Sequence, residues 1–137
     1  MTETDVIYSK LGYLTITRKE NPSHIYFAWE SFDIPLDDCV NAFQEAEKAM
    51  VERGVFHIIT NTASVKQALR PEVAKWWGEV CMPSLARCGV KLIVSVVPAG
   101  ADTGSTDVFS TITMKKAASV KDAESLVRAF AKDKGGG

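Results

Sequence analysis

Residues 55–60 read Val-Phe-His-Ile-Ile-Thr and residues 90–97 read Val-Lys-Leu-Ile-Val-Ser-Val-Val. Short, almost continuously apolar runs of this kind are typical of strands that are covered on both faces. Between the two runs, a helical pattern opens at Arg70-Pro71-Glu72 and ends at Gly89. A strand, a helix and a strand of these lengths predict a βαβ unit, in which the two strands are parallel and the connection is right-handed.

The helical pattern inside this unit contains two adjacent tryptophans, Trp76 and Trp77. Consecutive helical positions point about 100° apart, so at most one of the two indoles can lie centrally in the core. We expect the other at the margin of the core or at a contact surface. Because proline lacks a backbone N–H, we also expect Pro83 to interrupt or restart the helix.

The chain before this unit predicts an antiparallel meander followed by an amphipathic helix. β-branched and aromatic residues at 6–8, 13–17 and 24–30 indicate three strands with turns between them. From Leu36 the apolar period changes to about three and a half, which predicts a helix over residues 36–53. The apolar stripe of this helix is Leu36, Cys39, Val40, Phe43, Ala46, Met50 and Val51.

The chain after this unit predicts a loop, one or two short elements and a last helix. Residues 98–107 are rich in small and polar residues, residues 108–112 predict a short helix or an edge strand, and residues 114–118 predict a weak strand. Ser119 followed by Asp122 resembles a capping box and opens the last helix.

This order of elements predicts an α/β fold with a mixed β-sheet, an antiparallel N-terminal meander, a parallel βαβ centre and helices packed on the sheet. We expect residues 1–133 to form a single domain and residues 134–137 to be a disordered Gly-rich tail.

Composition excludes several classes of function. The 137 residues carry a formal net charge of -1, which argues against nucleic-acid binding. No apolar run is long enough to span a membrane, and the N-terminus lacks a signal segment, so we expect a cytoplasmic protein. The three cysteines are odd in number and lack CxxC spacing, so we interpret them as reduced thiols and expect no metal and no cofactor.

Two polar loops follow the two strands of the βαβ unit, at residues 61–64 and 99–105. Carboxyl ends of neighbouring parallel strands lie at one edge of a sheet, so we expect the loops to form one polar rim. Hydroxyls, an amide and backbone N–H groups at such a rim can hold a small anion, although loops of this composition also simply turn the chain. Our candidate ligand-binding or partner-binding residues are Asn61, Trp76, Trp77, Asp102, Thr103 and Ser105.

Catalytic patterns are weak. His24 and His57 lie in predicted strands, where a structural imidazole is the more common role, and Ser95 lacks a surrounding GxSxG pattern. The loop at 99–105 matches neither GxxxxGK[ST] nor GxGxxG. We therefore expect no enzyme.

The pattern resembles the STAS-domain family, particularly its SpoIIAA-like and stand-alone STAS/SEC14-type bacterial domains, over residues 5–131. The likeness rests on the meander, the helix from Leu36, and the strand at 55–60 with its polar loop. It also rests on Trp77 followed by Pro83-Ser84-Leu85, then Gly89-Val90 leading into a strand that ends at Pro98, and the Asp122-Ala123-Glu124 start of the last helix.

The resemblance implies a regulatory role. In anti-sigma factor antagonists of this family, the loop after the central strand carries an Asp-Ser-Ser/Thr motif, and a partner kinase phosphorylates its hydroxyl. The matching residues here are 61–64, where Asn61 replaces the family's Asp and Ala63 interrupts the hydroxyl pair. Thr62 and Ser64 are therefore the candidate phosphoacceptors.

Two functions follow as hypotheses. The first is a non-enzymatic STAS-like binding or regulatory domain that recognises a protein partner under control of phosphorylation. The alternative is a small-molecule or lipid-binding protein with an apolar pocket at the C-terminal ends of the parallel strands. That pocket would lie under the tryptophan helix and be lined by Trp76 or Trp77, with Phe109 as a further candidate. Either protein could be a monomer or a homodimer.

Overall fold

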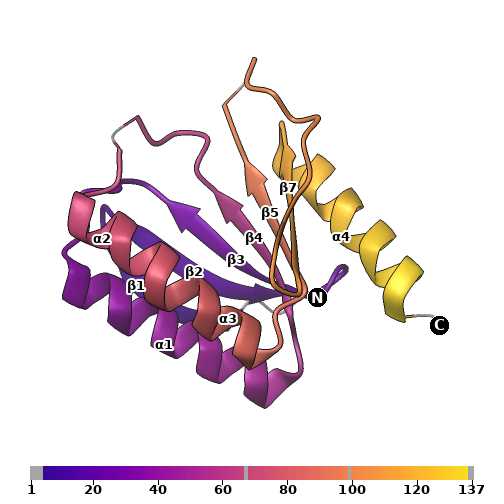
Figure 1. Ribbon diagram of the computed structural model, residues 1–137, viewed down its shortest axis with the longest axis horizontal. Coiled ribbons are helices and arrows are strands. Elements are labelled where there is room, and N and C mark those ends of the chain that lie inside the picture. The colour runs from indigo at the N-terminus through magenta and orange to yellow at the C-terminus, as the bar shows by residue number, and fades with distance from the viewer. Residues whose placement is uncertain (1–4, 67, 99, 136–137) are drawn as a thin grey trace.

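The structure is a computed structural model that describes residues 5–66, 68–98 and 100–135. Within these residues, a single seven-stranded sheet has the strand order β1-β2-β3-β4-β5-β7-β6 and carries helices on both faces (Figure 1). The elements are β1 (Asp5–Lys10), β2 (Leu14–Lys19), β3 (His24–Trp29), α1 (Leu36–Arg53), β4 (His57–Asn61), α2 (Pro71–Trp76), the π-helical segment η1 (Trp77–Cys81), α3 (Met82–Cys88), β5 (Leu92–Val96), β6 (Asp107–Phe109), β7 (Ile112–Ala117) and α4 (Val120–Gly135).

The sheet combines an antiparallel start with a parallel centre. β1, β2 and β3 pair antiparallel, whereas β3, β4, β5 and β7 pair parallel in that order. The expected α/β fold class is therefore confirmed. Of the two options for residues 108–112, the edge strand is right for 108 and 109 only: β6 pairs antiparallel with β7, Ser110 turns the chain at a φ of 56°, and Ile112 already belongs to β7.

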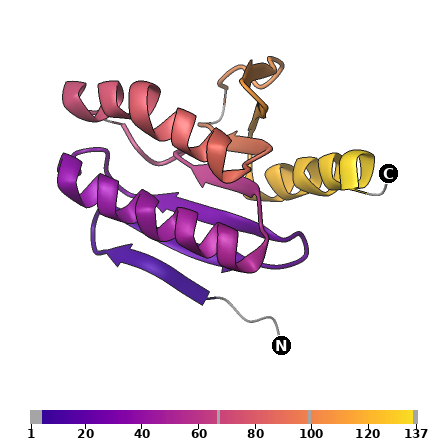
Figure 2. The same cartoon turned by 60° about the horizontal axis from the view of Figure 1, so that its bottom comes forward.

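Two hydrophobic cores lie on opposite faces of this sheet. The larger core lies under α1 and the continuous helix α2–η1–α3, and the smaller core lies under α4 (Figures 1 and 2). Ile58 belongs to the larger core, and the next residue of β4, Ile59, belongs to the smaller one. This two-sided burial explains why β4 and β5 are almost continuously apolar in sequence.

The helix boundaries follow local chemistry. α1 spans the expected residues 36–53 and ends at Gly54, which has a φ of 67° and donates its N–H to the carbonyl of Met50. At the start of α4, the Ser119 hydroxyl accepts a hydrogen bond of 3.1 Å from the N–H of Asp122. α4 continues through Lys134 and Gly135, where the sequence predicts the start of the tail, while residues 136 and 137 lie outside the described residues.

The helix from Pro71 to Cys88 changes form near Pro83. η1 occupies residues 77–81, and α3 then begins at Met82 with Pro83 in its first turn. Proline has no N–H to donate to the carbonyl four residues earlier, so a regular α-helical hydrogen bond is lost at this point. The wider π turn lies immediately before this loss.

Candidate functional site

A cavity of about 170 Å³ lies between the sheet and helices α1 and α2, at the carboxyl ends of β3, β4 and β5. Most of its lining is apolar or aromatic, and four of the lining side chains are buried. Open α/β sheets bind ligands at this place because the loops diverge beyond the strand ends. The lining residues are Trp29, Phe32, Cys39, Phe43, Thr60, Thr62, Leu69, Val73, Trp77 and Ser95.

Aromatic side chains form much of the cavity wall. The ring centroids of Phe43 and Trp77 are 5.2 Å apart, with an angle of 70° between their planes. Trp29 and Phe32 have the same centroid distance of 5.2 Å and an angle of 77°. These edge-to-face contacts lie in the favourable range for aromatic pairs, so each ring is fixed by a neighbour.

Three hydroxyl groups provide polar atoms in the cavity lining. Thr60 of β4 and Ser95 of β5 are register partners in the parallel ladder. Nε1 of Trp29 donates a hydrogen bond of 2.9 Å to Oγ1 of Thr60. Oγ1 of Thr62 donates a bond of 3.1 Å to the carbonyl of Val96. The polar atoms thus lie together on the sheet side of a cavity that is otherwise apolar.

Cys39 is the titratable residue that lines the cavity, and it is 1% exposed. Burial raises the pKa of its thiol to about 11, so the thiol is protonated at neutral pH. A protonated thiol is a poor nucleophile and carries no charge. The described lining of the cavity is therefore electrically neutral.

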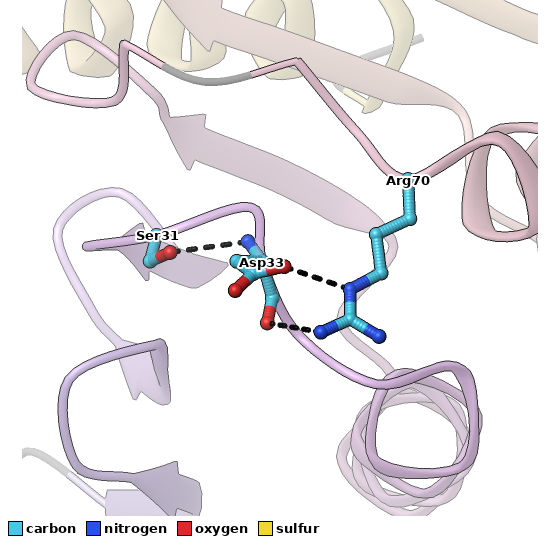
Figure 3. A network of polar contacts seen from close by, with 3 residues as sticks. All are labelled: Ser31, Asp33 and Arg70. Carbon is cyan, nitrogen blue, oxygen red and sulfur yellow. Dashed lines mark hydrogen bonds and ion pairs between the residues drawn. The ribbon is translucent and has the colours of Figure 1, made fainter.

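An ion pair joins the two segments at the edge of the cavity (Figure 3). Nε of Arg70 donates to Oδ1 of Asp33 at 2.8 Å, and Nη2 of Arg70 donates to the Asp33 carbonyl at 3.4 Å. The N–H of Asp33 in turn donates to Oγ of Ser31 at 3.0 Å. Phe32 and Leu69 line the cavity and directly precede Asp33 and Arg70 in sequence. The Asp33–Arg70 pair therefore holds these two lining residues near each other.

The structure separates the two tryptophans that the sequence singled out. Trp77 lines the cavity, whereas Trp76 contacts Phe43 with a centroid distance of 5.6 Å and lines a smaller hollow next to α1. Both indoles are half-buried, so neither lies centrally in the core. Phe109 lies in another hollow, beside Pro83 and Ala86.

The first polar loop divides between the two faces of the sheet. Thr62 lines the cavity, but Asn61 lies on the opposite face, where its Nδ2 donates to the hydroxyl of Tyr26 at 2.8 Å. Oδ1 of Asn61 also accepts the N–H of Ala63 at 3.1 Å. Ser64 is exposed in the turn that follows.

The second polar loop is exposed and contributes no described residue to the cavity lining. Oδ1 of Asp102 accepts the N–H of Gly104 at 2.8 Å, and Thr103 and Ser105 are exposed. The sequence pattern indicates this loop, but the residue near the end of β5 that lines the cavity is Ser95. The signal that could have found Ser95 and Thr60 is a hydroxyl residue at the second-last position of each central strand.

The two histidines lie on the α4 face, away from the cavity. Nδ1 of His24 lies 2.6 Å from the carbonyl oxygen of Pro22, and the His57 ring packs edge-on against Phe130 with a centroid distance of 5.6 Å. Burial lowers the pKa of both imidazoles. These are the surroundings of structural histidines.

A larger hollow of about 380 Å³ lies at the opposite ends of the strands, beside Gly54, His57, Lys91 and Ala131. Val55 is the one described residue of its lining that is buried, whereas four lining residues of the cavity beside Trp77 are buried. Among the described residues, no group of three metal-ligating side chains is found, and no helix is long and apolar enough to cross a membrane.

Comparison of the chain with family models, with curated proteins and with solved structures gave no match.

Proposed function

We propose that this chain is a non-enzymatic binding domain that holds a small, largely apolar molecule in the cavity between β3, β4, β5 and the helices α1 and α2. The observation that carries the proposal is the cavity itself, which is apolar, partly enclosed and located at the carboxyl ends of the parallel strands. A cavity of about 150 Å³ in another protein is large enough to bind benzene. The cavity here, at about 170 Å³, suits a ligand of one ring rather than a whole lipid.

The chemistry of the lining supports a role in binding rather than catalysis. The Cys39 thiol is protonated at neutral pH, and the imidazoles of His24 and His57 lie on the other face of the sheet. Among the described residues that line the cavity, none can act as a base toward a hydroxyl nucleophile at Thr60 or Ser95. The meander and the parallel βαβ centre also support membership of the STAS-like domains, and with it a cytoplasmic location.

An apolar probe tests this function. The melting temperature of the protein is measured with increasing toluene, because a ligand that binds only the folded state raises it. We expect toluene to raise the melting temperature of the wild type. In Leu69→Trp, where the added ring occupies the edge of the cavity, we expect the rise to disappear. Leu11→Trp is the matched control, since Leu11 is 94% exposed in the β1–β2 turn. A rise that is equal in both variants, or absent from the wild type, contradicts the proposal.

A second candidate function is a phosphorylation-controlled interaction module, favoured by the exposure of Ser64. Of the two hydroxyls in the loop, that of Ser64 is accessible, whereas that of Thr62 is bonded to the Val96 carbonyl and lines the cavity. A phosphate on Ser64 would add about two negative charges to a chain of net charge -1.

Intact-mass and phosphopeptide measurements on protein from its native cells test this second function. Phosphate on Ser64, with Thr62 unmodified, supports it. Unmodified residues at both positions under all growth conditions contradict it.

A further inference from the structure

The Thr60–Ser95 hydroxyl pair places hydrogen-bonding groups where the surrounding positions are apolar. Thr60 and Ser95 are register partners on β4 and β5, and neighbouring strands lie about 4.8 Å apart. Two residues earlier on the same face of each strand are Ile58 and Ile93, which belong to the larger core. A core position normally takes an apolar residue, so adjacent hydroxyls at the cavity indicate a polar group to be recognised there.

The hydrogen atoms of these hydroxyls show which kind of group fits. The indole N–H of Trp29 can only donate, so Oγ1 of Thr60 accepts in that bond and its own O–H remains to donate. The Ser95 hydroxyl has no hydrogen-bond partner among the residues that the structure describes. The cavity therefore presents an O–H donor at Thr60 and, at Ser95, a hydroxyl that can donate or accept. A hydroxyl group of the ligand matches both, because its oxygen accepts and its O–H donates.

The charge of the ligand follows from the absence of ionised groups in the described lining. The Cys39 thiol is protonated. At the edge of the cavity, the charges of Asp33 and Arg70 neutralise each other in their ion pair. A charged ligand would lose its hydration without gaining an opposite charge, which is strongly unfavourable. The ligand is therefore neutral.

The shape of the ligand follows from the aromatic wall. Trp29, Phe32, Phe43 and Trp77 surround a volume of about 170 Å³, which holds one six-membered ring with a small substituent. Flat rings pack favourably against aromatic edges and faces at centroid distances of about 4.5–7 Å.

We propose that the cavity binds a neutral monocyclic aromatic alcohol, of which phenol is the simplest, whose oxygen accepts a hydrogen bond from Thr60 and whose O–H donates to the Ser95 hydroxyl. This inference rests on the proposed function, because it names the class of ligand for the same cavity. It goes beyond that function in stating which end of the ligand faces the sheet.

Phenol and toluene are the probes, since they have nearly the same size and differ in the oxygen. The three tryptophan indole N–H signals are followed by two-dimensional NMR during each titration. We expect phenol to shift the signals of Trp29 and Trp77 and to leave that of Trp76, which lies outside the cavity, nearly unchanged. We expect toluene to shift the same two signals with about tenfold weaker affinity, and negatively charged benzoate to cause no shift.

The variant Ser95→Ala removes the hydroxyl and keeps the apolar cavity, so it tests the role of the hydroxyl by itself. We expect it to weaken phenol binding several-fold and to leave toluene binding unchanged, while Ser125→Ala on the exposed side of α4 alters neither. Equal affinities of phenol and toluene for the wild type, or a phenol preference that survives in Ser95→Ala, overturn this inference but leave the proposed function standing. Failure of both compounds to shift Trp29 and Trp77 overturns both. A thermal melt of each variant confirms that it is folded.

Discussion

The indole N–H of Trp29 donates a hydrogen bond of 2.9 Å to the Thr60 hydroxyl, which connects the end of β3 to the end of β4 at the cavity. Trp29 is only 7% exposed, so its N–H has little access to water as an alternative partner. This bond fixes the indole that forms one wall of the cavity, and it orients the Thr60 proton toward another acceptor.

Thr60→Val is expected to destabilise the protein by about 1–3 kcal/mol, because it leaves a buried indole N–H without an acceptor. Thr60→Ser keeps the oxygen and is the matched control, with a much smaller loss expected. Urea unfolding measures the free energy of unfolding of both variants. The chemical shift of the Trp29 indole proton reports whether its hydrogen bond to residue 60 is lost. Equal stability of the Val and Ser variants would show that the bond contributes little.

Breaking the Asp33–Arg70 pair is expected to change ligand exchange more than stability. The pair is exposed, so its loss has little effect on the free energy of unfolding. Because it holds Phe32 and Leu69 together, Arg70→Ala is expected to raise both the association and the dissociation rates of phenol. NMR line shapes measure these rates.

The charge-swapped double variant Asp33→Arg/Arg70→Asp is the control for that prediction. It restores an ion pair across the same two segments, so its exchange rates are expected to return toward those of the wild type. Rates that stay fast in the swapped variant would assign the effect to side-chain size rather than to the pair.

Two glycines are expected to respond to alanine in opposite directions. Gly89 has a φ of 114°, and an added Cβ would lie 3.2 Å from the Phe56 ring, so Gly89→Ala is expected to cost about 1–3 kcal/mol. Gly78 is helical with open space around it, so Gly78→Ala is expected to stabilise the protein by about 0.5–1 kcal/mol. Urea unfolding of the two variants measures the sign of each change in the free energy of unfolding. A stabilising effect of Gly89→Ala would contradict the described end of the helix.

The stability of the fold is expected to fall as the pH decreases below about 6.5. Burial lowers the pKa of His24 from its ordinary value of 6.5. The hydrogen bond to the Pro22 carbonyl and the charge of Glu124 act in the opposite direction, and Lys19 and His57 add to the decrease. The unfolded chain then binds a proton at a pH where the folded chain does not. The contribution of His24 to stability is therefore complete above pH 6.5 and decreases as the pH falls from 6.5 toward the lower pKa of the folded state. His57 contributes with the same sign, since burial also lowers its pKa.

His24→Asn tests the pH prediction, because the asparagine amide can still donate to the Pro22 carbonyl. The variant is expected to lose part of the pH dependence of the free energy of unfolding between pH 5 and 7. If His24→Asn and the wild type have the same pH dependence, His24 is not its source.

The sequence predicts the fold more completely than the site. The extent of α1 follows from its hydrophobic period, and the strands β4 and β5 follow from continuous apolar runs, because burial on both faces of the sheet requires them. β6 remained ambiguous because its three residues are too few to establish a period. The sequence does not predict the π turn that begins at Trp77, although Pro83 marks the place where regular hydrogen bonding is lost.

The site was harder to predict because its residues come from five separate segments. Trp77, a predicted binding residue, lines the cavity, and so does Thr62, which the sequence indicates as a phosphoacceptor rather than as a binding residue. Asn61 lies on the other face, because side chains alternate along a strand and its immediate neighbours Thr60 and Thr62 already face the cavity. Trp29 and Ser95 have the types expected of strand interiors, so only the pairing of β3, β4 and β5 reveals that they share one cavity.

The central claim, that the cavity binds a phenol, is tested most directly by a crystal structure from crystals of the protein grown in the presence of phenol. The account predicts electron density for one ring between Trp29 and Trp77, with its oxygen within hydrogen-bond distance of the Thr60 and Ser95 hydroxyls. An empty cavity, or a cavity filled by repacked side chains, at a phenol concentration that saturates the NMR titration would contradict it.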